Sequence, residues 1–141
     1  MIIKRWVYII FSVGLLLAAL PLFADEGPAE PDAGTMKLTR AVMCESIEAY
    51  EPKDVAVTFP IGVGKISCYM SFEGINNPTH AYQKWYRRDA LVTTKRLTLK
   101  PPSWSTYSSI QLRESDKGPW RVEIYDARNQ LLTTLRFSVT E

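Results

Sequence analysis

The chain has few of the side chains on which metal and nucleophilic chemistry depend, since only one of its 141 residues is histidine and two are cysteine. Near His80, Cys44 and Cys68 there is neither a C-x-x-C nor an H-x-x-x-H spacing, so a tetrahedral metal site has no obvious ligand set. The G-x-S-x-G and S-x-x-K motifs of serine nucleophiles are missing. Gly62 and Gly64 are not followed by the Lys-Ser/Thr of a phosphate-binding loop. We therefore expect no catalytic residue, no metal and no cofactor.

A marked excess of charge of one sign is also missing. Two of the 17 basic residues, Lys4 and Arg5, lie in an apolar N-terminal segment, which leaves 15 basic and 15 acidic residues in the rest of the chain. A neutral chain offers no basic footprint for DNA or RNA and no polybasic surface for a membrane. We therefore expect no nucleic acid among its partners.

The N-terminus has the three parts of a secretory signal. A short basic region precedes an apolar stretch from Val7 to Leu20, and Pro21 stands shortly before the small residue Ala24. We interpret residues 1–24 as a signal peptide cleaved after Ala24, which leaves no integral membrane span. The alternative is an uncleaved helical anchor, because the apolar stretch is near the minimum length for a span. Either interpretation places the rest of the chain in the periplasm or outside the cell.

Residues 25–35 form a short polar segment after the signal. The run from Asp25 to Gly34 contains two prolines, two glycines and four acidic residues, with no large apolar side chain. Such a segment buries too little surface to offset the entropy of ordering it. We predict a disordered leader at 25–35 and one folded domain at 36–141.

Beyond residue 36 the apolar residues recur at a period of two. Ile66, Cys68, Met70 and Phe72 alternate with polar residues, which is typical of a half-buried strand. Further strands are expected at Leu38–Cys44, Val55–Phe59, Ala81–Arg87, Leu91–Leu99, Thr106–Leu112, Trp120–Ile124 and Leu135–Val139, with turns at 51–54 and at 126–130 among others. Seven or eight short strands predict an all-β fold, an antiparallel β-sandwich of immunoglobulin-like arrangement. A partly open barrel is the alternative.

The two cysteines form a possible pair in a chain that we expect to be exported. Cys68 has the inward parity of its strand, and Cys44 shares its parity with Val42 and Leu38. We therefore expect both thiols to face one core and to form a disulfide, which would stabilise the domain by about 3 kcal/mol. Two reduced core thiols are the alternative.

Several sequence elements follow one another as in a known family. They are Arg40-Ala41-Val42, Glu51-Pro52, Phe72, Lys84-Trp85-Tyr86, the run 103–109, the run 118–122 and the run 135–139. This order resembles the bacterial family called domain of unknown function 2914, over roughly residues 38–140. The resemblance implies an exported or membrane-linked small β-sandwich and no established activity. Family members commonly have a histidine two positions before the tryptophan that matches Trp85, where this chain has Gln83.

His80 and Ser108 are the residues most easily mistaken for catalytic groups. His80 follows a predicted loop at 76–79, and hydroxyls beside a strand start usually satisfy backbone groups. Neither residue has a recognisable catalytic partner in the sequence. We expect alanine at either position to leave biological activity largely intact.

The aromatic residues carry the clearest functional signal. Tyr69 and Tyr125 have the outward parity of their strands, whereas Trp120 has the inward parity. Exposed aromatic side chains provide a platform for a partner protein or for a sugar ring. We predict a non-enzymatic module that binds another envelope protein, with a carbohydrate or cell-wall glycan as the alternative ligand. The expected interaction surface consists of Tyr69, Trp85, Trp104 and Tyr125.

The signal peptide predicts the N-terminus of the mature protein. N-terminal sequencing of the native protein should begin at Asp25, because the apolar stretch ends at a proline and a small residue that suit cleavage. Recovery of an intact form beginning at Met1 from the membrane fraction would instead support the uncleaved anchor.

Overall fold

The computed structural model describes residues 35–141. The expected signal peptide at 1–24, and the expected leader up to residue 34, lie outside the described residues. Thr35, the last residue of the expected leader, belongs to the domain, because its hydroxyl donates a hydrogen bond to the carbonyl of Gly74 (3.0 Å). Over the described range there is no helix with the length and apolar character needed to cross a membrane.

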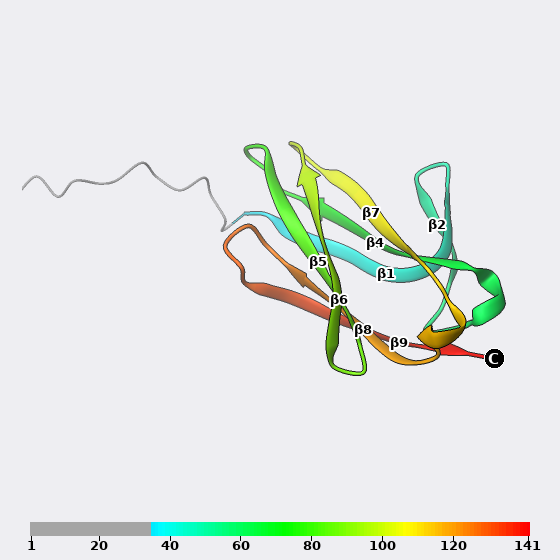
Figure 1. Cartoon of the computed structure of the whole chain (residues 1–141). Helices are drawn as coiled ribbons and strands as arrows, with labels where there is room; N and C mark the ends of the chain where they lie inside the picture. Colours follow the sequence, from blue (N-terminus) through cyan, green and yellow to red (C-terminus); the bar gives the residue numbers. More distant parts are fainter. Residues whose placement is uncertain (1–34) are drawn as a thin grey trace, which may run out of the picture.

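Nine strands make up the described part of the chain (Figure 1). They are β1 (Lys37–Glu48), β2 (Glu51–Val55), β3 (Thr58–Pro60), β4 (Lys65–Glu73), β5 (Thr79–Arg87), β6 (Ala90–Leu99), β7 (Trp104–Gln111), β8 (Gly118–Tyr125) and β9 (Leu131–Thr140). Short 3-10 turns at Ile61–Val63 and Glu114–Asp116 precede β4 and β8. The structure has one strand more than the seven or eight expected from the sequence, because the region expected as one strand at 55–59 is divided between β2 and β3.

The strands form two sheets packed face to face as a sandwich (Figure 1). One sheet has the order β2-β1-β4-β7 and the other the order β3-β9-β8-β5-β6. Neighbouring strands are antiparallel, except that β3 runs parallel to β9. β5 carries a fully buried tryptophan, Trp85, as strand C does in immunoglobulin domains. The expected immunoglobulin-like β-sandwich is confirmed.

Aromatic rings occupy the centre of the core. Trp120 stacks on Phe137 with ring centroids 5.9 Å apart, and Phe59 and Trp85 meet the same Phe137 ring edge to face. Trp120 is 4% exposed, as its inward parity predicted, and its indole nitrogen donates to the carbonyl of Asp116 (2.7 Å). One ring therefore links side chains from β3, β5, β8 and β9.

The turn expected at residues 51–54 is wrong. The chain turns instead at Ala49 and Tyr50, which have φ values of 48° and 64°, and residues 51–55 form β2. Two successive positive φ angles are what a tight hairpin of the primed type requires, and this chain adopts them without glycine or asparagine. Pro52 is tolerated because β2 is an edge strand, which needs backbone donors on one side only.

The expectation that both thiols face one core is also wrong. In the register of β1 and β4, Met43 pairs with Cys68, and Cys44 pairs with Ser67. Directly paired residues share a face, so Cys68 points into the core and Cys44 points to the other side of the sheet. A β-bulge between Leu38 and Arg40 is the physical reason, because an extra residue reverses the alternation that follows it.

Both cysteines are free thiols, and the disulfide expected between them is not present. Thiols on opposite faces of neighbouring strands do not meet the geometry of a disulfide. Burial raises the pKa of Cys44 and, more strongly, that of Cys68. Both sulfurs therefore remain protonated. Cys68 acts as a small core side chain, whereas Cys44 is buried on the opposite face of the sheet.

Substitutions on the two faces of β8 should lower the free energy of unfolding by different amounts. Trp120→Ala should lower the free energy of unfolding by about 3–5 kcal/mol, because it empties a core position. Tyr125→Ala, on the outer face of the same strand, should cost less than half as much. Denaturant midpoints of the two variants compare them directly, and equal losses would mean that the faces of β8 are reversed.

Candidate functional site

A chain of buried hydrogen bonds crosses between the two sheets. The indole nitrogen of Trp85 donates to the hydroxyl of Ser108 (3.2 Å), and that hydroxyl donates to the side-chain carbonyl of Gln83. The amide nitrogen of Gln83 donates to the backbone carbonyl of Cys68 (3.1 Å). Within the described range, every buried side-chain nitrogen and oxygen has a hydrogen-bond partner. Ser108 therefore serves structure, although no partner for it was recognisable in the sequence.

Gln83 stands where the resemblance implies a histidine in family members, and its contacts are ones that a histidine can also make. Gln83 is fully buried and uses one donor and one acceptor. A neutral imidazole also has one donor and one acceptor, so either residue can bridge the sheets. His80 does not replace this role, because it has the opposite parity and pairs on β6 with Thr98, away from the core. Its Nδ1 lies 3.4 Å from the guanidinium of Arg96.

The outer face of the five-stranded sheet is the candidate functional site. Six outward side chains at the centre of β5 and β8 are aromatic or charged, and all six are half-buried. We call this surface the tyrosine face; it consists of Tyr82, Lys84, Tyr86, Arg121, Glu123 and Tyr125.

Contacts within the tyrosine face hold its side chains in place. The Lys84 ammonium lies 4.3 Å from the centre of the Tyr125 ring, and the Arg121 guanidinium lies 4.1 Å from that of Tyr86. Glu123 accepts hydrogen bonds from Arg121 (3.1 Å) and from the hydroxyl of Tyr125 (2.7 Å). Cation–π contacts and charge-assisted hydrogen bonds of this kind restrict long side chains that would otherwise be mobile.

Glu123 is the electrostatic centre of the tyrosine face. Its carboxylate is 16% exposed, and burial alone would raise its pKa, but hydrogen bonds from Tyr125 and Arg121 outweigh burial and lower the pKa. The same hydrogen bond raises the pKa of Tyr125. Glu123 is therefore charged and Tyr125 protonated at neutral pH.

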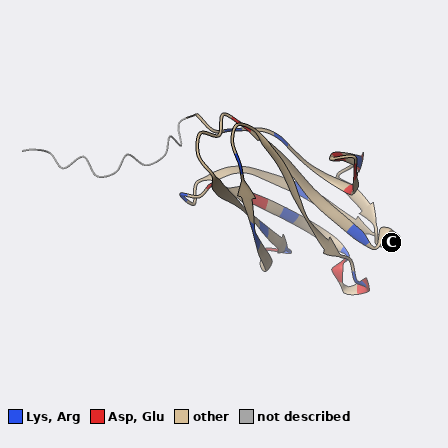
Figure 2. Ribbon diagram, turned by 90° about the horizontal axis from the view of Figure 1, so that it is seen from above, with Lys and Arg blue, Asp and Glu red and all other residues tan. Residues whose placement is uncertain are grey.

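Cations outnumber carboxylates on and around the tyrosine face. Arg96 on β6 is paired with Tyr82, and Arg136 on β9 is paired with Arg121, so both extend the face on its two sides. Lysines and arginines, drawn in blue, lie both within strands and at their connections (Figure 2). The residues that face outward on these four strands include four cations, Lys84, Arg96, Arg121 and Arg136, and one carboxylate, Glu123. A second carboxylate, that of Asp89 in the β5–β6 turn, is ion-paired with Arg121.

The residues expected to form one interaction surface are separated by the fold. Trp85 is fully buried in the core and is unavailable to a partner, so its inclusion was wrong. Tyr125 lies on the tyrosine face. Tyr69 and Trp104 belong to the other sheet, where Tyr69 is largely covered and Trp104 is 37% exposed. The sequence did contain a signal for the missed residues, because Tyr82, Lys84 and Tyr86 alternate with buried residues on β5.

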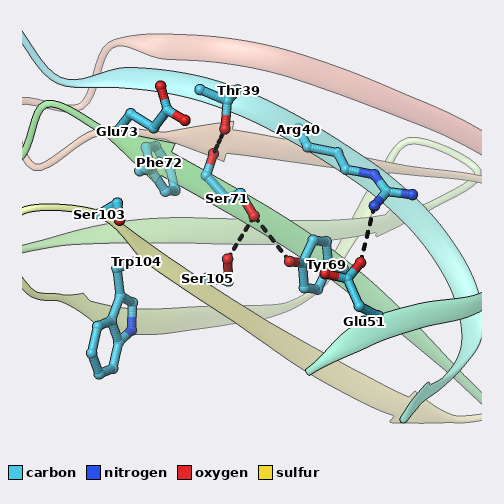
Figure 3. Close-up of a pocket in the computed structure, with 10 residues that line it drawn as sticks. All are labelled: Thr39, Arg40, Glu51, Tyr69, Ser71, Phe72, Glu73, Ser103, Trp104 and Ser105. Atoms are coloured by element: carbon cyan, nitrogen blue, oxygen red, sulfur yellow. Dashed lines mark hydrogen bonds and ion pairs between the residues drawn. The ribbon is translucent and has the colours of Figure 1, made fainter. Parts of the chain in front are cut away.

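Tyr69 and Trp104 both line a polar hollow on the four-stranded sheet (Figure 3). Its volume is about 330 Å³, and its remaining lining residues are Thr39, Arg40, Glu51, Ser71, Phe72, Glu73, Ser103 and Ser105. The indole of Trp104 points away from Ser71 and Ser105 (Figure 3), since Trp104 pairs with Phe72 on the other face of the sheet. Trp104 therefore forms a rim of the hollow and not its floor.

Comparison with known proteins supports a family assignment for the second half of the domain. A family described as "Protein of unknown function (DUF2914)" matches residues 78–139, which confirms the resemblance over those residues. No curated protein matches the chain. The matched segment spans most of β5 to β9 and includes the whole tyrosine face, whereas most of the hollow lies outside it.

The contact between Glu123 and Tyr125 predicts a change in tyrosine titration. In the native protein Tyr125 should ionise at a higher pH than an ordinary tyrosine, because its proton is held by a carboxylate. Glu123→Gln removes that charge and should lower the pKa of Tyr125. NMR titration of the tyrosine ring resonances measures both values, with exposed Tyr107 on the other sheet as the internal control. An unchanged Tyr125 titration in Glu123→Gln would contradict the assigned contact.

Proposed function

We propose that this domain is a non-enzymatic module of the cell envelope that binds an acidic surface of a partner protein through its tyrosine face. The observation that carries the proposal is the ordered array of tyrosines and cations on one outer sheet face. The location in the envelope rests on the signal peptide expected at residues 1–24.

The side chains of the tyrosine face are already held in place in the free domain. This favours binding, because association normally costs side-chain entropy. Immobilising a long side chain at an interface costs about 0.5–1.5 kcal/mol. Lys84 and Arg121 already lie over the Tyr125 and Tyr86 rings in the free domain, so part of that cost has been met on folding. Tyrosine and arginine are also the residue types enriched among interface hot spots.

The charge of the tyrosine face indicates the chemistry of its partner. Four cations, Lys84, Arg96, Arg121 and Arg136, lie there with two carboxylates, Glu123 on the face and Asp89 in the adjoining β5–β6 turn, where it is ion-paired with Arg121. A surface with this excess of cations steers acidic partners toward it and disfavours basic ones. We therefore assign the partner an acidic protein surface.

The residues that could suggest catalysis are engaged in other contacts. Ser108 is bonded to Trp85 and Gln83 inside the core. The pKa of His80 is lowered by partial burial and by the neighbouring Arg96, and its ring contacts Tyr82 edge to face at 5.1 Å. This arrangement supports a binding role over a chemical one.

Site-specific photo-crosslinking tests the proposal in cells that make the protein naturally. A photo-reactive phenylalanine at position 82 should capture a discrete partner, because Tyr82 lies on the tyrosine face. The same probe at position 107, which is 49% exposed on the other sheet, is the control and should capture much less of it. Equal capture at both positions, or none at position 82, would contradict the proposal.

Charge reversal tests the chemistry assigned to the partner. Arg136→Glu should reduce capture at position 82 several-fold and make the remaining capture less sensitive to salt, because a cation is lost at the edge of the face. Lys65→Glu is the matched control, since Lys65 begins β4 on the other sheet. A similar reduction by both variants would mean that overall charge, and not the tyrosine face, controls the capture.

A further inference from the structure

We infer that the polar hollow beside Tyr69 is a second binding site, and that it takes a neutral saccharide. The hollow lies on the four-stranded sheet, so it is separate from the tyrosine face of the other sheet. A volume of about 330 Å³ is at the small end of ligand pockets in proteins. It suits a small ligand that contacts polar groups on several strands.

Hydroxyl groups line the hollow in a hydrogen-bonded row. The Ser71 hydroxyl donates to the Tyr69 hydroxyl (3.0 Å) and also lies 2.7 Å from the Ser105 hydroxyl (Figure 3). A serine has one hydroxyl proton, so Ser105 is the donor to Ser71. The Tyr69 hydroxyl accepts the bond from Ser71, so its own proton can be donated to a ligand in the hollow. Tyr69 is 4% exposed and is one of the residues that line the hollow.

Charged groups beside the row supply both acceptors and donors. Arg40 and Glu51 form a long ion pair (3.4 Å) and remain 46% and 62% exposed, so a ligand can reach both. The Arg40 guanidinium also lies 5.8 Å from the centre of the Tyr69 ring. A sugar hydroxyl both donates and accepts, which matches a site in which carboxylate, guanidinium and hydroxyl groups converge.

The balance of charge in the hollow distinguishes a neutral ligand from an anionic one. Arg40 is the one cation among the lining residues, and it stands against the carboxylates of Glu51 and Glu73. Among the lining groups an anion would meet net negative charge, since the Lys100 ammonium lies outside the lining, 5.4 Å from the centre of the Trp104 ring. A neutral polyol can use every lining group without a charge penalty. The lining is largely polar, which disfavours an apolar ligand. Because Trp104 points away from the row, binding should rely on hydrogen bonds more than on ring stacking.

NMR titration of the isotopically labelled full chain tests the inference. The probes are glucose, galactose and N-acetylglucosamine as neutral sugars, and glucuronate as the anionic comparison. At least one neutral sugar should shift the backbone amides of Thr39, Ser71 and Ser105 in a saturable way, and glucuronate should bind more weakly than glucose. Failure of all three neutral sugars to shift these amides, or tighter binding of glucuronate, would overturn the inference.

Variants locate the binding in the hollow. Tyr69→Phe keeps the ring and removes the donor, so affinity for the bound sugar should fall roughly five- to tenfold, the effect of one hydrogen bond. Tyr107→Phe on the neighbouring strand is the matched control and should bind as the wild type does. If Tyr69→Phe alters the fold, as its spectrum would reveal, Arg40→Gln at an exposed position should also weaken binding. If a variant keeps the native spectrum and still binds the sugar with wild-type affinity, the assignment of the site to the hollow is overturned. That result would not bear on the proposal for the tyrosine face.

Discussion

The arrangement of this domain depends on the buried hydrogen bonds that join Trp85, Ser108 and Gln83 to the backbone of β4. They connect the centre of β5 in one sheet to β7 and β4 in the other. A polar group buried without a partner costs about 1–3 kcal/mol, so the sheets are favoured in the one alignment that pairs all of these groups. That alignment places Gln83 and Trp85 inward, and the alternation of the strand then places Tyr82, Lys84 and Tyr86 outward.

Strand alternation also gives the two outer surfaces of the sandwich different chemistry. On the five-stranded sheet, tyrosines and cations surround one well-bonded carboxylate, Glu123. On the four-stranded sheet, short hydroxyl side chains such as Ser71 and Ser105 leave a hollow beside Tyr69. The first surface carries more cations than carboxylates, which suits the acidic partner that we propose, and the second is a polar hollow. One strand pattern therefore underlies both of the binding surfaces that we propose.

Much of the fold could be predicted from local pattern, because period-two alternation and turn composition are properties of short segments. The strands around Met70 and Trp120, the hairpin at 126–130 and the sandwich all follow from it. The β-bulge after Leu38 could not be predicted, and it reversed the expected direction of Cys44. The pairing of distant strands also could not be predicted from the sequence. The outward parity of Tyr82 and Lys84 could be inferred from local alternation, but only the register of β5 with β8 brings these residues beside Tyr125.

The most direct test of this account asks whether Gln83 and Ser108 act as one structural unit. A double-mutant cycle with Gln83→Leu, Ser108→Ala and the double variant, followed by denaturant unfolding, measures their coupling. Each single change leaves a buried polar group unpaired, so each should cost about 1–3 kcal/mol. The double variant should lose less than the sum of the two by about 0.5 kcal/mol or more, because the second change also removes the group that the first left unpaired. Strictly additive losses would contradict the account, since they would mean that these residues do not act together in joining the sheets.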